Sequence, residues 1–269
     1  MPDFAVIRKK ISPYNKKIFV DGDKSISIRW ALLASQAIGK STASNLPNSE
    51  DINSTIDCLK RLGIKIIKKN NNCEIFGNGL NGFNYQKNIT INAGNSGTCG
   101  RLILGLLIAS KKKIKLKGDK SLSSRDFSRV TSPLERFGAK FFPLKRKNLP
   151  ISILGSNFTR PINYLENIGS AQCKSSIMLA ALNTPGKTLI KAKKSRNHTE
   201  LLFKSLKIPI KIKKEKKYDF IEVEGKKNFK SFDYKIPGDI SSSAFFIVLT
   251  LISKNSQLTI KNVNVNSTR

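Results

Sequence analysis

The stretch GDKSISIR at residues 22–29 returns almost unchanged as GDKSLSSR at residues 118–125. A weaker third copy, GDISSS, occupies residues 238–243. Each copy places a glycine and an aspartate directly before serines, which is the pattern of a capped helix N-terminus. Because self-similarity along a chain indicates a repeated supersecondary unit, these copies predict a fold built from repeats.

A second element also repeats, as RLGIKI at 61–66, RFGAKF at 136–141 and, more loosely, LKIPIKI at 206–212. Each copy has the pattern of a helix end, a Gly or Pro stop and an alternating strand. We expect helices near residues 25–37, 49–62, 98–110, 132–137, 171–182, 198–206 and 241–252. We expect strands at 17–20, 65–67, 74–76, 88–91, 113–117, 140–143, 151–154, 188–191, 208–213, 220–223 and 257–261. This alternation predicts an α/β fold of βαβ character.

The composition excludes two broad classes of protein. Hydrophobic residues make up 39% of the 269 residues, enough to form a core, so wholesale disorder is excluded. The longest apolar runs, at 102–109 and 244–252, fall well short of the roughly 20 residues of a membrane span. Residues 1–4, MPDF, do not open a signal peptide. We therefore expect a cytoplasmic protein that does not enter a membrane.

The charge balance is extreme: 49 basic and 18 acidic residues give a net charge of +31. Such an excess is compatible with a protein that binds RNA or another polyanion. The lysines, however, are spread throughout the chain, including loops such as KKNNN at 68–72, which favours a general compositional bias. No zinc-finger spacing or RNA-binding aromatic signature accompanies them. We predict no nucleic-acid partner.

Histidine and cysteine chemistry is poorly represented. The four cysteines are far apart and form no CxxC pair, and His198 is the only histidine, so a zinc site is not expected. Scattered cysteines in a chain without a secretion signal are typical of a reducing compartment. We expect His198 to cap or pack near a helix start, and any chemistry to use lysine, arginine and carboxylates.

Four expected helices open with glycine and small polar residues, at 22–25, 94–98, 169–172 and 238–241. A helix N-terminus offers free N–H groups and the positive end of the helix dipole, and both favour anions. Arginine forks suit phosphate and carboxylate, and lysine adds a mobile charge. Four such side chains, Lys24, Arg29, Arg125 and Arg196, lie close by in the sequence. The openings therefore predict phosphate or carboxylate sites.

The segment ASQAIGKS at 34–41 nearly matches a nucleotide-binding phosphate loop. It lacks the first glycine of that motif and follows an expected helix, whereas the motif follows a strand. We interpret Gly39 as a helix C-cap and reject nucleotide hydrolysis.

Six motifs, taken in order, resemble those of the 5-enolpyruvylshikimate-3-phosphate (EPSP) synthase family, in particular its class II branch. They are GDKSISIR at 22–29, GNSGTCGR at 94–101, GDKSLSSRDFSRV at 118–130, SAQCKS at 170–175, RNHTE at 196–200 and PGDISSSA at 237–244. The resemblance extends over essentially the whole chain.

The resemblance implies the enolpyruvyl transferase fold, in which each of two lobes holds three βαβαββ units. It implies that residues 19–234 form one complete lobe and that 1–18 and 235–269 belong to the second, incomplete lobe. It also implies a chain truncated at its C-terminus, with little or no activity alone. The acidic groups that transfer protons would lie in the missing half, so no catalytic residue is assigned here.

The implied activity moves the enolpyruvyl group of phosphoenolpyruvate to the 5-hydroxyl of shikimate 3-phosphate and releases phosphate. This step belongs to chorismate and aromatic amino acid biosynthesis. The family needs no metal or organic cofactor, and the full-length enzyme is expected to be a monomer.

Matching positions carry the family's binding roles. The predicted contacts to shikimate 3-phosphate are Lys24, Ser25, Arg29, Ser170, Ala171, Gln172 and Arg196. Those to phosphoenolpyruvate are Lys24, Gly97, Arg125 and Gln172. Glycine rather than alanine at position 97 predicts glyphosate sensitivity of the full-length enzyme. Two positions depart from the family: Ile28 replaces a usual histidine, and Asp126 replaces a common proline and adds negative charge beside Arg125.

Three alternatives stay open at this point. UDP-N-acetylglucosamine enolpyruvyl transferase shares the fold, but that family has asparagine where this chain has Ser25, and often a loop cysteine that residues 117–129 lack. A non-enzymatic protein that binds RNA or another polyanion would account for the charge. A degenerate module that only sequesters shikimate 3-phosphate would keep the same binding motifs.

Overall fold

The computed structural model describes residues 10–269. Three four-stranded sheets form its main body. The first has the order β13 (Asp233–Lys235), β2 (Ile38–Ser44), β4 (Asn72–Asn78), β3 (Lys65–Lys69). The second has the order β5 (Thr90–Asn92), β6 (Ile114–Lys117), β8 (Ile151–Leu154), β7 (Lys140–Phe142). The third has the order β9 (Asn163–Glu166), β10 (Lys187–Lys193), β12 (Tyr218–Glu224), β11 (Ile210–Lys214).

All three sheets have the same topology. In each, the first strand runs parallel to the second, and the remaining pairs are antiparallel. The helices that connect them are α1 (Lys24–Gln36), α2 (Glu50–Arg61), α3 (Gly97–Leu106), α4 (Lys120–Ser123), α5 (Ser128–Arg136), α6 (Ala171–Leu182) and α7 (His198–Ser205). This arrangement confirms the prediction of an α/β fold built from repeated βαβαββ units. In the first sheet the parallel strand is β13, which comes last in the chain among the strands of the main body and completes this sheet.

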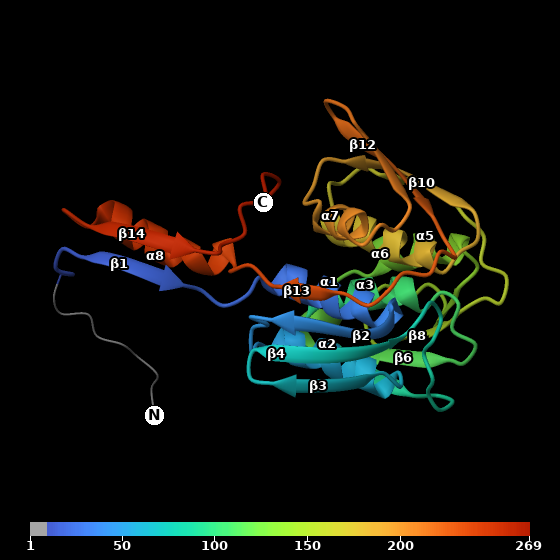
Figure 1. Cartoon of the computed structure of the whole chain (residues 1–269). Coiled ribbons are helices and arrows are strands. Elements are labelled where there is room, and N and C mark those ends of the chain that lie inside the picture. Colours follow the sequence, from blue (N-terminus) through green and yellow to red (C-terminus); the bar gives the residue numbers. More distant parts are fainter. Residues whose placement is uncertain (1–9) are drawn as a thin grey trace.

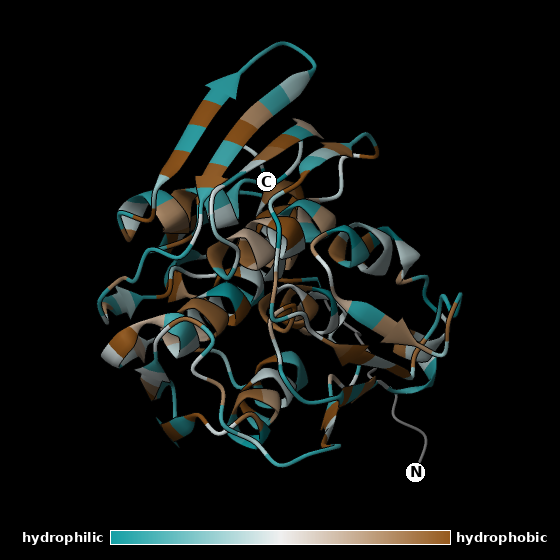
Figure 2. Ribbon diagram, turned by 90° about the vertical axis from the view of Figure 1, so that its right-hand side faces the viewer, coloured by the Kyte–Doolittle hydropathy of each residue, from teal (hydrophilic) through white to brown (hydrophobic). Residues whose placement is uncertain are grey.

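Helices α1, α3 and α6 form the centre of the body, and the sheets lie around them (Figure 1). Their side chains are buried nearly all round, as expected of helices enclosed by other elements. Gly105 lets α3 approach α6 closely, because a Cβ there would lie 2.2 Å from the backbone oxygen of Ser176. The strands alternate buried and exposed residues, most clearly β10, so each sheet turns one face inward (Figure 2).

A smaller part stands to one side of this body (Figure 1). Here β1 (Asn15–Phe19) pairs in parallel with β14 (Gln257–Lys261), and α8 (Ile240–Ile252) packs on them. Helix α8 is apolar, yet Phe245 and Leu251 are about four-fifths exposed. This part fits the predicted start of a second lobe. Within residues 10–269, no helix is both long and apolar enough to cross a membrane.

Several elements differ from the sequence prediction. Strand β2 was not predicted, because IGKSTAS lacks apolar alternation. Gly39 lies inside β2 with φ of +105°, and Ala37 ends α1, so the interpretation of Gly39 as a C-cap was wrong. The short elements β9, β13 and α4 were also missed, and α5 begins at Ser128, four residues earlier than expected. The prediction about residues 1–4 lies outside the described residues, as does half of segment 1–18.

Candidate active site

Three capped helix N-termini provide the frame of the candidate site. Asp23 caps α1 by accepting from the N–H of Ile26 at 3.0 Å. Ser96 and Ser170 cap α3 and α6, each accepting from a backbone N–H at 3.2 Å. Three of the four predicted helix openings are thus confirmed as caps here, and in the fourth Asp239 caps α8 by accepting from the N–H of Ser241 at 2.8 Å. Their use as phosphate or carboxylate sites stays a prediction. The backbone N–H groups that the caps leave free are available to an anion.

Arg29 joins α1 to the starts of α6 and α7. It is only 4% exposed. Its Nε donates to Oγ1 of Thr199 at 2.8 Å, and its Nη2 donates to Oγ of Ser175 at 3.1 Å. Nη1 donates to the backbone oxygen of Ser25 at 2.9 Å. Thr199 in turn donates to Ser175 at 2.7 Å, so three helices share one buried polar cluster.

The charge of Arg29 survives this burial. Desolvation lowers the pKa of its guanidinium to about 10, partly offset by the carboxylates of Glu200 and Asp23. The group therefore stays protonated at neutral pH. Three of its five N–H donors are used inside the protein, and the other two have no partner among residues 10–269.

Gln172 and Arg101 connect α6 to α3. Nη1 of Arg101 donates to Oε1 of Gln172 at 2.9 Å, and Nε2 of Gln172 donates to Oγ1 of Thr98 at 2.9 Å. The guanidinium of Arg101 lies over the Phe127 ring, 5.0 Å from its centroid. Burial is the largest cause of the lowered pKa of Arg101. Gln172 is therefore held in one orientation at the start of α6.

Gly97 lies beneath two arginines. A Cβ at this position would lie 2.8 Å from Nη1 of Arg101 and 3.1 Å from Nη1 of Arg125. Arg125 itself is exposed, and its Nη2 donates to Asn95 at 3.1 Å and to Ser121 at 3.3 Å. The structure thus brings Gly97 and Arg125 together, as the sequence predicted, and adds Arg101 to them.

Asp126 directs its carboxylate to the backbone near the start of α5. It accepts from the N–H of Ser128 at 2.6 Å, and hydrogen bonds from Ser128 lower the pKa of this carboxyl group. The acid that departs from the family pattern therefore has a local partner.

Two predicted residues, Lys24 and Arg196, lie at the exposed edge. Nζ of Lys24 forms an ion pair with Oδ2 of Asp51 at 3.1 Å, and its backbone N–H donates to Asp239 at 3.2 Å. Arg196 precedes α7 and makes no hydrogen bond to any other residue in the described range. Within residues 10–269, neither the Lys24 ammonium nor the Arg196 guanidinium donates to Arg29, Ser175 or Thr199, although the charge of Arg196 contributes to the lowered pKa of Arg29.

His198 is buried behind the site. Its Nε2 lies 3.4 Å from Nδ2 of Asn264. Burial, and next the charge of Arg29, lower the pKa of His198 to about 4, so the ring is neutral at pH 7. The prediction that this histidine packs near a helix start is confirmed.

Sequence reasoning missed Arg101, Ser175 and Thr199, although each stands inside a quoted motif. Arg101 closes GNSGTCGR, Ser175 closes SAQCKS and Thr199 lies within RNHTE. Their presence in these blocks was the available signal. Which of them face one another follows only from the packing of α1, α3, α6 and α7.

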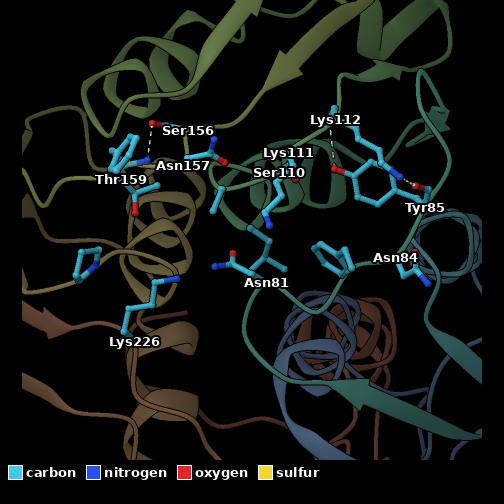
Figure 3. A pocket seen from close by; sticks show the side chains of 15 residues that line it. Asn81, Asn84, Tyr85, Ser110, Lys111, Lys112, Ser156, Asn157, Thr159 and Lys226 are labelled. Carbon is cyan, nitrogen blue, oxygen red and sulfur yellow. Dashed lines mark hydrogen bonds between the residues drawn. The ribbon is translucent and has the colours of Figure 1, made fainter.

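A separate hollow of about 580 Å³ opens at the other end of the central helices. Leu106, which ends α3, lines it, whereas Gly97 begins that helix. Asn81, Lys111 and Lys226 point toward its interior (Figure 3). None of the residues predicted to bind substrate lines this hollow, so it is distinct from the candidate site.

Comparison with known proteins agrees with this geometry. Residues 8–269 match the family model described as EPSP synthase (3-phosphoshikimate 1-carboxyvinyltransferase). A 3-phosphoshikimate 1-carboxyvinyltransferase of Caldicellulosiruptor saccharolyticus is 40% identical over 97% of this chain, and one from a Thermoanaerobacter strain is 42% identical over 94%. The solved EPSP synthase of Acinetobacter baumannii superposes with a TM-score of 0.86 at 32% identity, covering 96% of this chain and 57% of that one.

The chain spans about 60% of the length of these curated relatives. The match nevertheless includes every motif and every helix described above. With the family model covering nearly the whole chain and the fold superposing closely, this chain belongs to the EPSP synthase family.

Proposed function

We propose that this chain provides the shikimate 3-phosphate site of an enolpyruvyl transferase. The observation that supports it is the buried Arg29 cluster. It joins three helices, and two of its guanidinium N–H donors have no partner in the part of the chain that the structure describes. Such an arrangement favours a ligand that carries both a phosphate and a carboxylate.

The proposed contacts to shikimate 3-phosphate are shared among three helix starts. Lys24, Ser25 and Arg29 come from α1, and Arg196 precedes α7. Ser170, Ala171 and Gln172 stand at the start of α6. The free N–H groups there would take the phosphate oxygens, while Arg196, which makes no hydrogen bond within residues 10–269, would close over them.

Phosphoenolpyruvate would bind next to this site, toward α3. Its proposed contacts are Lys24, Gly97, Arg125 and Gln172. Arg101 connects the two subsites, because it reaches both Gln172 and the space above Gly97. The absence of a side chain at position 97 would leave room for a carboxylate or phosphate between the two guanidinium groups.

The proposed reaction joins the two substrates. The 5-hydroxyl of shikimate 3-phosphate gives its proton to a general base as its oxygen bonds to C2 of phosphoenolpyruvate, and C3 takes a proton from a general acid. The intermediate then loses a proton from C3 while the bond from C2 to the phosphate oxygen breaks, which restores the C2–C3 double bond and releases inorganic phosphate. Arginine and lysine stabilise the phosphate oxygens throughout. The proton transfers need a general acid and base, to which no residue of this chain is assigned.

We also propose that residues 19–234 form one lobe and that 1–18 and 235–269 begin the other. Three sheets of one topology support the complete lobe, and β13 closes its first sheet and ends at Lys235, one residue past the proposed boundary. The pairing of β1 with β14 beside α8 supports the start of the other lobe. A monomeric, cytoplasmic enzyme without a cofactor stays a prediction.

Calorimetric titration with shikimate 3-phosphate tests the proposal, with UDP-N-acetylglucosamine as the competing acceptor. We expect selective binding of shikimate 3-phosphate that is weakened in Arg196→Ala. Because Arg196 is exposed and makes no hydrogen bond in the described part of the chain, that variant should keep the parent's circular dichroism and thermal midpoint. Equal or preferred binding of the nucleotide sugar would contradict the proposal, as would a folded chain that binds neither ligand.

A further inference from the structure

Two buried side chains of opposite charge, Lys174 and Glu200, connect α6 and α7 directly behind the candidate site. Their side chains are 0% and 4% exposed, and Nζ of Lys174 lies 2.5 Å from Oε1 of Glu200. Lys174 is the fourth residue of α6, and Glu200 is the third residue of α7. Neither has a role in the substrate contacts proposed above.

This ion pair is not arranged for greatest stability. The Lys174 ammonium makes no hydrogen bond to a further residue in the described part of the chain, and Oε2 of Glu200 also has no partner there. The lysine additionally stands near the positive end of α6, where a cation is disfavoured. Replacing a buried pair by uncharged residues of similar volume is often neutral or stabilising. A role in placing the two helices is a better physical account of the pair than stability.

The pair lies next to the cluster that holds Arg29. Ser175 and Thr199, the immediate neighbours of Lys174 and Glu200 in the sequence, are hydrogen-bonded to each other at 2.7 Å. The starts of α6 and α7 are therefore linked at two consecutive positions, once through hydroxyl groups and once through charges. Of these two links between the helices, Arg29 donates hydrogen bonds only to the one made by the hydroxyl groups.

We infer that Lys174 and Glu200 are positioning residues for the shikimate 3-phosphate site. By fixing the separation of two helix starts, the pair holds Ser170–Gln172 on α6 opposite Arg196 before α7. Neither residue touches the substrate. The inference rests on the proposed function, because it concerns the two halves of that same phosphate site.

The test is a double variant, Lys174→Met with Glu200→Gln, compared with the parent chain. We expect a urea midpoint close to the parent's, because the variant removes one charge of each sign and Arg29 keeps the carboxylate of Asp23 nearby. We expect affinity for shikimate 3-phosphate to fall about 10- to 100-fold, the size of effect expected when a hydrogen bond to a charged group is lost. The matched control is Lys40→Met with Glu74→Gln, an exposed pair at 3.2 Å, which should leave the affinity unchanged.

A loss of affinity with an unchanged urea midpoint supports the positioning role. If the pair served only the stability of the fold, the double variant would instead lower the urea midpoint. Parent-like affinity in the double variant overturns the inference. Should that variant not fold, Glu200→Asp keeps both charges but withdraws the carboxylate by one methylene group. A lower affinity is expected for Glu200→Asp, and unchanged affinity contradicts the inference.

Failure of the proposed function would be separable from failure of this inference. If the parent chain binds no shikimate 3-phosphate, the proposed function is wrong. Amide hydrogen exchange then decides the inference without a ligand. The N–H groups of Cys173 and Leu201, bonded to Ser170 and Asn197, should exchange faster in the folded variant than in the parent. Equal rates would overturn the positioning role.

Discussion

Arg29 and Arg125 hold the same place in two copies of one motif, yet their surroundings are opposite. GDKSISIR starts a 13-residue helix, α1, whose arginine is buried and makes three internal hydrogen bonds. GDKSLSSR starts α4, which has four residues, and its arginine is exposed. After Arg29 the chain continues as WALLA, which packs in the core, whereas after Arg125 it continues as DFS and the helix has already ended. The residues after the motif, rather than the motif itself, set the environment of each cation.

The largest expected difference between the two copies is in stability. Arg29→Ala should lower the free energy of unfolding by about 3 kcal/mol, because it leaves Ser175 and Thr199 without their charged donor inside the protein. Arg125→Ala should change it by about 0.5 kcal/mol or less, as is usual for exposed positions. Urea denaturation measures both.

The same pair of variants also separates the two proposed subsites. Arg29→Ala should abolish measurable binding of shikimate 3-phosphate, while Arg125→Ala should leave it near the parent value. Equal losses of unfolding free energy in the two variants would contradict this account, because only the hydrogen bonds of Arg29 are expected to contribute strongly to stability.

Lowering the pH should reduce the free energy of unfolding through His198, which is buried behind the site. Burial holds the pKa of His198 near 4 in the folded chain, below about 6.5 for an unfolded chain. As the pH falls, the unfolded state therefore takes up the proton first. The loss of stability starts near pH 6.5 and is complete below about pH 4, where it reaches at most about 3 kcal/mol.

Urea titrations at pH 7, 6 and 5 measure this loss, with His198→Gln as the control that cannot titrate. The parent should lose more stability than the control between pH 7 and pH 5. Parallel losses in the two proteins would mean that other groups account for the acid sensitivity.

The repeated motif predicted the repeated fold correctly but not its period. In the structure, α1 occupies the place of α3 and α6, as the first helix of its unit, whereas α4 follows β6 as a second-helix element. The copies at residues 22–29 and 118–125 are therefore not equivalent positions. The second repeated element, which ends α2, α5 and α7 and opens β3, β7 and β11, does mark the true period. A helix stop followed by a strand is a packing requirement of every unit, while GDKS is a good cap wherever a helix begins.

The candidate site, too, could be predicted only in part from the sequence. Helix starts and their arginines could be predicted, because capping and charge are local properties. The hydrogen bonds of Arg29 to Ser175 and Thr199 join residues 146 and 170 positions apart, which no local pattern specifies. Strand β2 was missed because its residues are polar and its pairing with β4 and β13 supplies the order that its sequence lacks.

A moderate effect on ligand affinity is expected for a substitution at Gly97, which lies beneath Arg101 and Arg125. Its φ is not in the left-handed region, so alanine suits the helix itself and would favour it by roughly 0.5–1 kcal/mol. The new methyl group would displace the guanidinium groups of Arg101 and Arg125, which lie 2.8 and 3.1 Å away. Gly97→Ala should therefore keep stability within about 1 kcal/mol of the parent. Its affinity for phosphoenolpyruvate, titrated with shikimate 3-phosphate present, should fall about tenfold, or about 1.4 kcal/mol. Unchanged affinity would show that the two guanidinium groups adjust freely.

The smallest effect is expected where the first motif copy itself reaches solvent, at Lys24. Its ion pair with Asp51 is half-exposed on the lysine side, and such pairs contribute about 0–1 kcal/mol. Asp51→Asn should therefore change the free energy of unfolding by about 0.5 kcal/mol or less. It should strengthen binding of shikimate 3-phosphate slightly, because Lys24 loses a competing carboxylate and the local potential becomes more positive. Titrations at low and high salt distinguish this account, since the gain should shrink as salt screens the exposed charges. A gain that is independent of salt would place the Lys24 ammonium in a buried contact with the ligand, and Lys24 would then belong with Arg29 rather than with Arg125.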